Sequence, residues 1–419
     1  MSQSVPVKEA TKRLLSVDAF RALTMLCMIF INDLSGVKGI PKWMDHAKMA
    51  EDGMGFADTI FPAFLFIVGL SVPLAVGRKL QKGESFGSIA FSILSRSFAL
   101  IVMGFFHVNM ENYNSASILR EPVWEICITT SFFLIWLDYP ATLSNLKKYS
   151  LIGLGWLILL LMAFLYTGGK PDAPEGLNPS WWGILGIIGW SYLVCAGIFL
   201  LVKGNFKALL IALIVLVLIN IFAHEAIWHL YWSIIHYTPP TTPLGPHRRL
   251  PHLNLWVIHD ASSASLVMAG IVVSLWYAKL TANNNKQAMW LLLAGAGVCA
   301  IAIGLLIRPY TEGISKIRST PSWIFICAGI SILVFELMIY LVDYKDKKNW
   351  FKIIWPAGTS TLTCYLLPYF QVAIMTLVYF RYPHFLNYGW GGFFRSWAVA
   401  FIIVMIGGLL EKYRLRLKI

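Results

Sequence analysis

Apolar runs of about 20 residues recur from one end of this chain of 419 residues to the other. A run of that length crosses the hydrocarbon core of a bilayer as an α-helix, because a helix satisfies its own backbone hydrogen bonds in lipid. The composition agrees: 13% of the residues are charged, against about 25% in soluble domains. We therefore expect an all-α polytopic integral membrane protein, a single bundle of about 12 (10–12) transmembrane helices.

The apolar runs define twelve candidate spans, joined mostly by short loops. They cover residues 19–35, 58–77, 88–107, 122–138, 150–167, 181–201, 206–223, 261–279, 288–307, 321–342, 354–380 and 393–410. The short loops leave no room for a soluble domain, so we expect one transmembrane domain over residues 1–419.

The net charge of +13 indicates membrane orientation rather than nucleic acid binding. If the N-terminus is cytoplasmic, most of the 34 Lys and Arg residues fall in inner loops or at inner span ends. Positive residues favour the cytoplasmic side, so this bias predicts that both termini are cytoplasmic. On this topology all nine histidines lie on the outer side or at outer span ends. Proton chemistry or ligand binding is therefore expected at the outer face.

The longest predicted loop, residues 224–260, is rich in Trp, His and Pro. A long irregular loop in a compact protein is often a lid or a binding element. One interpretation is that this loop shapes a substrate site. The alternative is an amphipathic segment lying along the membrane interface.

All six cysteines fall inside predicted spans. None lies in an outer loop, so we expect no disulfide framework, and their spacing matches no metal site. They are interpreted as small apolar packing residues.

Two arginines are candidates for binding a phosphorylated ligand. Arg21 lies in the first turn of the first span, after the helix-capping residue Asp18, and Arg96 lies midway along the third span. An arginine inside lipid needs a partner or a water-filled cavity, and a guanidinium group binds phosphate through paired hydrogen bonds. The alternative is a pair of structural ion pairs, Arg21 with Asp18 and Arg96 with Glu125.

A polar cluster follows the first span, and it contains Asn32, Asp33, Asp45, His46, Glu51, Asp52 and Asp58. His46 needs only a carboxylate neighbour to become an oriented base, and Asp58 could accept its Nδ1–H. Asn32 could donate an amide hydrogen to a developing oxyanion. A lone loop histidine is more often a surface residue. Here, however, the flanking polar residues sit at span ends that must converge.

Three segments resemble the heparan-α-glucosaminide N-acetyltransferase family and its bacterial relatives, within the transmembrane acyltransferase superfamily. They read RLLSVDAFRALTMLCMIFIND, WMDHAKMAEDGMGFADTIFPAFLFIVGLSVPLAV and SRSFALIVMG. The family-like core is expected over residues 13–110 and 255–419. The stretch 168–260 fits the family poorly and is expected to be an insert with two extra spans and a different outer loop. Two smaller departures are Ala22, where relatives have Gly, and Ser360, where they often have Asn.

The resemblance implies an enzyme that moves an acetyl group from cytoplasmic acetyl-CoA to a sugar amine on the far side of the membrane. It implies His46 as the catalytic histidine with Asn32 as its partner, and Asp58 is the expected orienting carboxylate. Acetyl-CoA would enter from the cytoplasmic side, where Arg21, Arg96 and Asp18 are the expected binding residues, and no metal is expected.

The same resemblance places the protein in a bacterial inner membrane, with a sugar or glycan acceptor in the periplasm. Since the acceptor region lies in the divergent stretch, the acceptor itself and the choice between N- and O-acetylation stay open. A homodimer is compatible with this interpretation, and no nucleic acid partner is expected.

Two other function classes compete with the enzyme. A proton-coupled secondary transporter of a small solute would use His46, Asp58 and Arg96 as a proton relay with its counter-charge. A membrane scaffold without chemistry would leave Arg96 and the polar cluster unexplained. Binding of CoA would favour the enzyme, whereas proton-coupled uptake without a CoA effect would favour the transporter.

Overall fold

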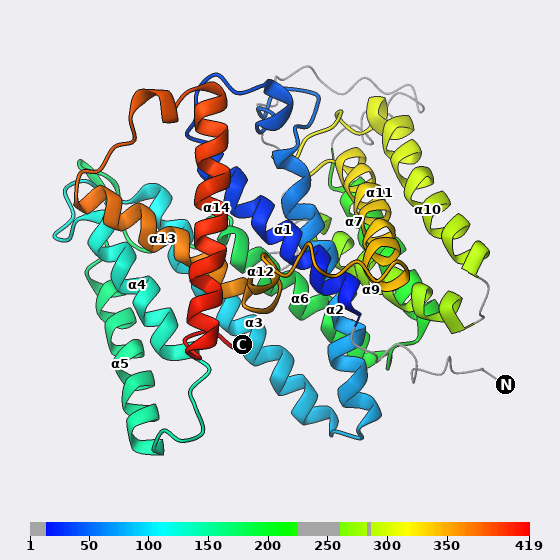
Figure 1. Ribbon diagram of the computed structural model, residues 1–419, viewed down its shortest axis with the longest axis horizontal. Coiled ribbons are helices and arrows are strands. Elements are labelled where there is room, and N and C mark those ends of the chain that lie inside the picture. The colour runs from blue at the N-terminus through cyan, green and yellow to red at the C-terminus, as the bar shows by residue number, and fades with distance from the viewer. Residues whose placement is uncertain (1–13, 225–259, 283–285) are drawn as a thin grey trace, which may run out of the picture. The chain divides into compact units, whose positions relative to one another are not determined.

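The computed structural model describes residues 14–224, 260–282 and 286–419, and helices make up nearly all of its regular structure (Figure 1). The helices are α1 (Leu15–Leu34), α2 (Ala57–Gln81), α3 (Phe86–Val108), α4 (Glu121–Trp136), α5 (Asn145–Phe164), α6 (Gly183–Leu201), α7 (Phe206–Phe222), α9 (Ser262–Ala282), α10 (Lys286–Ile307), α11 (Pro321–Met338), α12 (Trp355–Thr359), α13 (Thr361–Leu377) and α14 (Gly389–Lys412). A π-helical turn, Ile339–Tyr344, extends α11. One small hairpin pairs β1 (Gly168–Lys170) with β2 (Ala173–Glu175) in antiparallel register.

The predicted fold class is confirmed, because each predicted span is mostly helical. Within the described ranges, nine helices are long and apolar enough to cross a membrane. Two shorter apolar helices, α7 and α13, cover the predicted spans 206–223 and most of 354–380, and α4 covers most of 122–138. The protein is an all-α polytopic membrane protein.

One predicted span, 354–380, is not a continuous helix. It is divided into α12 and α13 at Ser360, whose backbone leaves the helical region with φ −119° and ψ 43°. Hydroxyls around the break bond to nearby backbone carbonyls, as Thr361 Oγ1 does to Gly358 O at 3.1 Å. Such local bonds compete with helix, and glycine adds backbone freedom. The chain therefore turns where hydropathy alone predicts a straight helix.

The chain divides into two compact units, which are described separately. Unit 1 contains residues 1–20, 41–94 and 190–348, and unit 2 contains residues 21–40, 95–189 and 349–419. The predicted single domain and its insert at 168–260 stay predictions. Most of the predicted outer loop 224–260 lies outside the described residues, and so do five of the histidines placed on the outer side: His229, His236, His247, His252 and His259.

In unit 1, α2 packs closely against α9. A Cβ added at Gly69 would lie 2.0 Å from the Val267 carbonyl oxygen, and one added at Gly270 would lie 2.1 Å from the Phe66 oxygen. Small residues let membrane helices approach until their backbones touch. This close approach strengthens van der Waals packing, which holds helices together in lipid because the lipid tails are as apolar as the helix surfaces. Helix α11 contacts both α2 and α9. Trp323 near the start of α11 donates to the carbonyl oxygen of Asp58 near the start of α2, so the two helix starts lie side by side.

Unit 2 contains most of α1 and the helices α4, α5, α13 and α14. Helix α4 packs on α5 and α13, and α13 packs on α14. Phe30 of α1 stacks on Trp397 of α14 with ring centroids 4.2 Å apart. Near the end of α1, Asp33 accepts hydrogen bonds from Arg395 at 2.8 Å and from Ser396 Oγ at 2.6 Å. These contacts hold α1 against α14.

Candidate active site

The loop that carries His46 is folded tightly before α2. The Phe56 N–H donates to Trp43 O at 2.7 Å, and Met44 is buried under the loop. Gly55 passes so close to Asp45 that an added Cβ would lie 1.8 Å from the Asp45 carbonyl oxygen. Only glycine fits that approach, so the loop path depends on it. The loop places His46 over the first turn of α2.

Asp58 lies in that first turn of α2 and is almost fully buried, with 1% of its side chain exposed. Its Oδ2 accepts backbone N–H groups from Ala47 and Gly55, both at 3.0 Å. Its Oδ1 lies 2.7 Å from His46 Nδ1. A helix N-terminus favours a negative charge. With this many donors around it, Asp58 is an ionised carboxylate that accepts from every neighbour.

The tautomer of His46 follows from Asp58. Because an ionised carboxylate can only accept, the 2.7 Å contact requires the proton to sit on Nδ1. The lone pair of the neutral ring is then on Nε2, which makes no hydrogen bond within the described residues. The His46 side chain is 38% exposed. The arrangement is an oriented base with an open nitrogen, as general-base and nucleophilic catalysis require.

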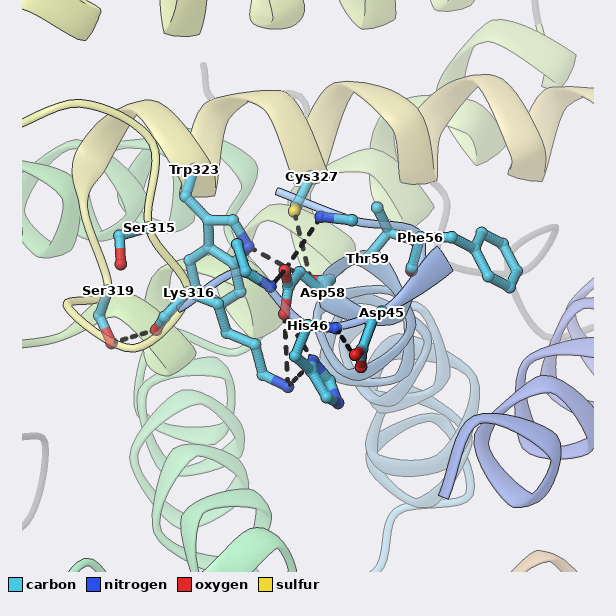
Figure 2. A network of polar contacts seen from close by, with 12 residues as sticks. Asp45, His46, Phe56, Asp58, Thr59, Ser315, Lys316, Ser319, Trp323 and Cys327 are labelled. Atoms are coloured by element: carbon cyan, nitrogen blue, oxygen red, sulfur yellow. Dashed lines mark hydrogen bonds and ion pairs between the residues drawn. The ribbon is translucent and has the colours of Figure 1, made fainter. Parts of the chain in front are cut away.

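Lys316 completes this cluster, and the sequence analysis missed it (Figure 2). Its Nζ lies 3.3 Å from His46 Nδ1 and 3.9 Å from Asp58 Oδ1. Burial lowers the pKa of Lys316, and the charge of Asp58 partly offsets that effect. Nothing in the residue pattern pairs a lysine with a histidine 270 positions earlier. Its place in a short loop between two spans was the available signal.

Helix α11 supports the backbone of Asp58 from behind. Trp323 Nε1 donates to the Asp58 carbonyl oxygen at 3.2 Å, and Cys327 Sγ lies 4.0 Å from the same oxygen. Trp323 and Cys327 are both buried. Cys327 was interpreted as a packing residue, and its position adds a contact behind the candidate base.

The His46 loop is also tied to the loop before α11. Asp52 accepts two bonds from Arg308 Nε, at 3.0 and 3.1 Å, and one from the Ile314 N–H at 2.6 Å. Gly53 N–H donates to Ile314 O at 2.9 Å. Burial alone would raise the pKa of Asp52, but the Ile314 hydrogen bond and the charge of Arg308 hold it below its ordinary value. We call this contact the Asp52–Arg308 clamp.

The remaining candidate residues, Asn32, Arg21, Arg96 and Asp18, lie on α1 and α3. Asn32 is exposed near the end of α1, in unit 2. Asp33 belongs with Arg395, as described above, although the sequence groups it with His46. The structure therefore brings together His46 and Asp58, while the role of Asn32 stays a prediction.

The residues expected to bind the donor are also in α1 and α3. Arg21 donates to Gly358 O at 3.3 Å, and both residues are in unit 2. Arg96 is half-buried in α3 of the same unit, and Asp18 is half-buried in the first turn of α1. Their binding of a phosphorylated donor stays a prediction. Across the part of the chain that the structure describes, no group of three or more His, Cys, Asp or Glu could hold a metal.

Comparison with known proteins yields a family and two curated relatives. A family model described as "Domain of unknown function (DUF5009)" matches residues 13–242. Heparan-alpha-glucosaminide N-acetyltransferase of Mus musculus is 35% identical over 102 residues, which cover 24% of this chain and 15% of that protein. The Homo sapiens protein of the same name is 37% identical over 97 residues, covering 23% and 14%. The similarity thus spans a small part of each relative.

Proposed function

This chain belongs to the family described as a domain of unknown function, DUF5009. For this member of the family, we propose the function of a membrane-embedded acetyltransferase. It would move an acetyl group from cytoplasmic acetyl-CoA to an amino sugar or glycan acceptor in the periplasm, from a bacterial inner membrane. The observation that carries the proposal is the contact between His46 Nδ1 and Asp58 Oδ1 at 2.7 Å. The two relatives named N-acetyltransferases supply the reaction class.

In the proposed reaction, His46 Nε2 takes a proton from the acceptor amine or hydroxyl as that group attacks the thioester carbonyl carbon. The carbon–sulfur bond then breaks, and the CoA sulfur leaves as a thiolate that receives the proton from His46. Asp58 holds the ring and stabilises the imidazolium charge between the two steps. A route in which Nε2 first takes the acetyl group would use the same ring orientation.

Other residues have proposed roles that rest on the sequence. Asn32 would donate its amide hydrogen to the oxyanion formed during attack. Arg21 and Arg96 would bind the phosphates of acetyl-CoA, because guanidinium groups pair with phosphate oxygens. Asp18 lies one helical turn before Arg21 on α1 and would share the donor end.

The test is an acetyl-transfer assay on the full chain in detergent or nanodiscs. Acetyl-CoA and glucosamine serve as probes, with release of the CoA thiol and formation of acetylated sugar measured by mass spectrometry. We expect His46→Gln to lower the rate by about 10²–10⁴-fold, the usual contribution of a general base. The control is His384→Gln, because His384 is exposed and stacks on Tyr388 in unit 2.

Near-wild-type transfer by His46→Gln would contradict the assignment of the base. The transporter alternative is tested in proteoliposomes made from the same preparation. Proton-coupled uptake of a solute, with no thermal shift on adding CoA, would replace the enzyme with a transporter.

A further inference from the structure

We propose that Lys316 is a positioning residue for His46, whose ammonium charge offsets Asp58 so that His46 Nε2 stays available as a base. The inference rests on the proposed function and extends it to a residue of the loop before α11. Lys316 would act through the His46–Asp58 pair and would not touch the acetyl group.

Three atoms set the geometry of this proposal. His46 Nδ1 lies 2.7 Å from Asp58 Oδ1, and Lys316 Nζ lies 3.3 Å from that nitrogen and 3.9 Å from that oxygen. An ammonium group can only donate hydrogen bonds, and an Nδ1 that carries a proton has no lone pair with which to accept one. His46 Nδ1 therefore donates to Asp58 Oδ1, and the Lys316 ammonium group faces the same oxygen as an ion pair. Figure 2 shows the lysine side chain ending beside both groups.

The balance of charge explains what the lysine does. With Lys316 charged, Asp58 ionised and His46 neutral, the three groups sum to zero. A second proton on His46 would place two cations on one carboxylate, with Asp58 almost fully buried and Lys316 only 29% exposed. Without Lys316, the negative charge of Asp58 would be uncompensated and would favour a second proton on His46. The lysine therefore disfavours the doubly protonated ring, which has no lone pair for the acceptor.

Within the described residues, few charged or titratable groups contact His46 or Asp58. Asp45 on its own loop accepts the His46 N–H at 2.8 Å, Asp58 comes from α2, and Lys316 comes from the loop before α11. Cys327 of α11 contacts the Asp58 carbonyl oxygen. Of these groups, Lys316 is the cation that directly faces the ring.

The loop holds Lys316 in place. The Ser319 N–H donates to Lys316 O at 3.1 Å, and Asn220 Nδ2 of α7 donates to Ser319 O at 3.1 Å. His224 adds a second attachment, because its Nε2 lies 3.0 Å from Arg318 O. The backbone that carries Lys316 is therefore attached to α7 through Asn220 and to His224, which follows α7.

The test compares Lys316→Met, Lys316→Arg and the control Lys42→Met, in the assay described above, across pH. The Lys42→Met substitution removes the same charge from an exposed position on the His46 loop. We expect the acid limb of the rate profile of Lys316→Met to move up by about one pH unit, the lower end of the effect of a charge at this distance. Lys316→Arg and Lys42→Met should keep the wild-type limb.

A second readout does not depend on acetyl transfer. Neutral imidazole reacts with diethyl pyrocarbonate, so modification of the His46 peptide, followed by mass spectrometry against pH, reports the same proton. We expect the modification curve of Lys316→Met to move up by the same amount. Lys316→Gln serves as a second neutral variant if Lys316→Met melts much earlier than the wild type.

The outcomes separate the two proposals. If the neutral variants and Lys316→Arg lose rate equally, and neither curve moves with charge, Lys316 is merely structural and the inference is overturned. If the modification curve moves but the wild-type protein transfers no acetyl group, the proposed function fails while the electrostatic role of Lys316 stands.

Discussion

At the scale of single residues, Asp58 is the group on which the candidate site depends. Its two carboxylate oxygens fix the loop through Ala47 and Gly55 and orient the ring of His46. Its carbonyl oxygen is held by Trp323 of α11. One residue therefore joins the start of α2, the loop and the imidazole ring of His46.

We expect Asp58→Asn to lower acetyl transfer by at least about 10²-fold. The amide cannot stabilise an imidazolium charge, and its NH₂ group would oppose Nδ1–H or favour the wrong tautomer. The matched control is Asp45→Asn, because the Asp45 side chain accepts the backbone N–H of His46, and an amide oxygen can still accept that bond. Equal rates in the two variants would show that the carboxylate does not orient the base.

The pairing of His46 with Asp58 could be anticipated from the sequence, since only 12 positions separate them and a helix start lies between. The contacts of Lys316 and Trp323 with this pair could not be anticipated. Apolar runs predict where helices lie in the sequence but not which helix ends lie side by side. Asp33 also has a partner that the sequence did not indicate. It is near His46 in the sequence, yet its carboxylate bonds to Arg395 of α14.

At the scale of elements, the apolar runs predicted the helices well, because lipid leaves the backbone few alternatives. The break between α12 and α13 was missed for a related reason. A hydropathy window averages over Gly358 and Ser360, and their apolar flanks hide the local hydroxyl bonds that end the helix.

The Asp52–Arg308 clamp gives a prediction about two loops. A carboxyl group whose pKa is lowered by folding adds stability above its unfolded pKa, about 3.9, and loses it as pH falls through the folded value. We expect the protection of residues 41–56 against hydrogen exchange, measured relative to the intrinsic rate at each pH, to fall below about pH 4. Arg308→Ala should lower this protection already at neutral pH.

The effect of the clamp on global stability should be small. Its side chains are 43% and 47% exposed, and exposed ion pairs contribute at most about 1 kcal/mol. Asp346→Asn is the control, since Asp346 pairs with Lys348 far along the chain from the His46 loop. Equal exchange of residues 41–56 in Arg308→Ala and Asp346→Asn would show that the clamp does not order the loop.

At the scale of the whole molecule, the prediction concerns membrane orientation. The apolar span Pro321–Tyr344 separates the loop beside His46 from the charged segment that follows it, so these should lie on opposite faces. In a chain without its native cysteines, a membrane-impermeant maleimide should label Lys42→Cys from outside. It should label Lys347→Cys only after the membrane is opened. Labelling of both from the same side would contradict the proposed orientation.

The distance along the chain between His46 and Lys316 also has a consequence for biosynthesis. His46 and Asp58 leave the ribosome early, whereas Lys316 and Trp323 follow more than 250 residues later, beyond residues 13–242 that define the family match. A nascent or truncated chain therefore carries the histidine without its lysine and without the helix behind Asp58. The complete arrangement of His46, Asp58 and Lys316 can form only once α11 has been made, so the proposed base would be complete late in translation.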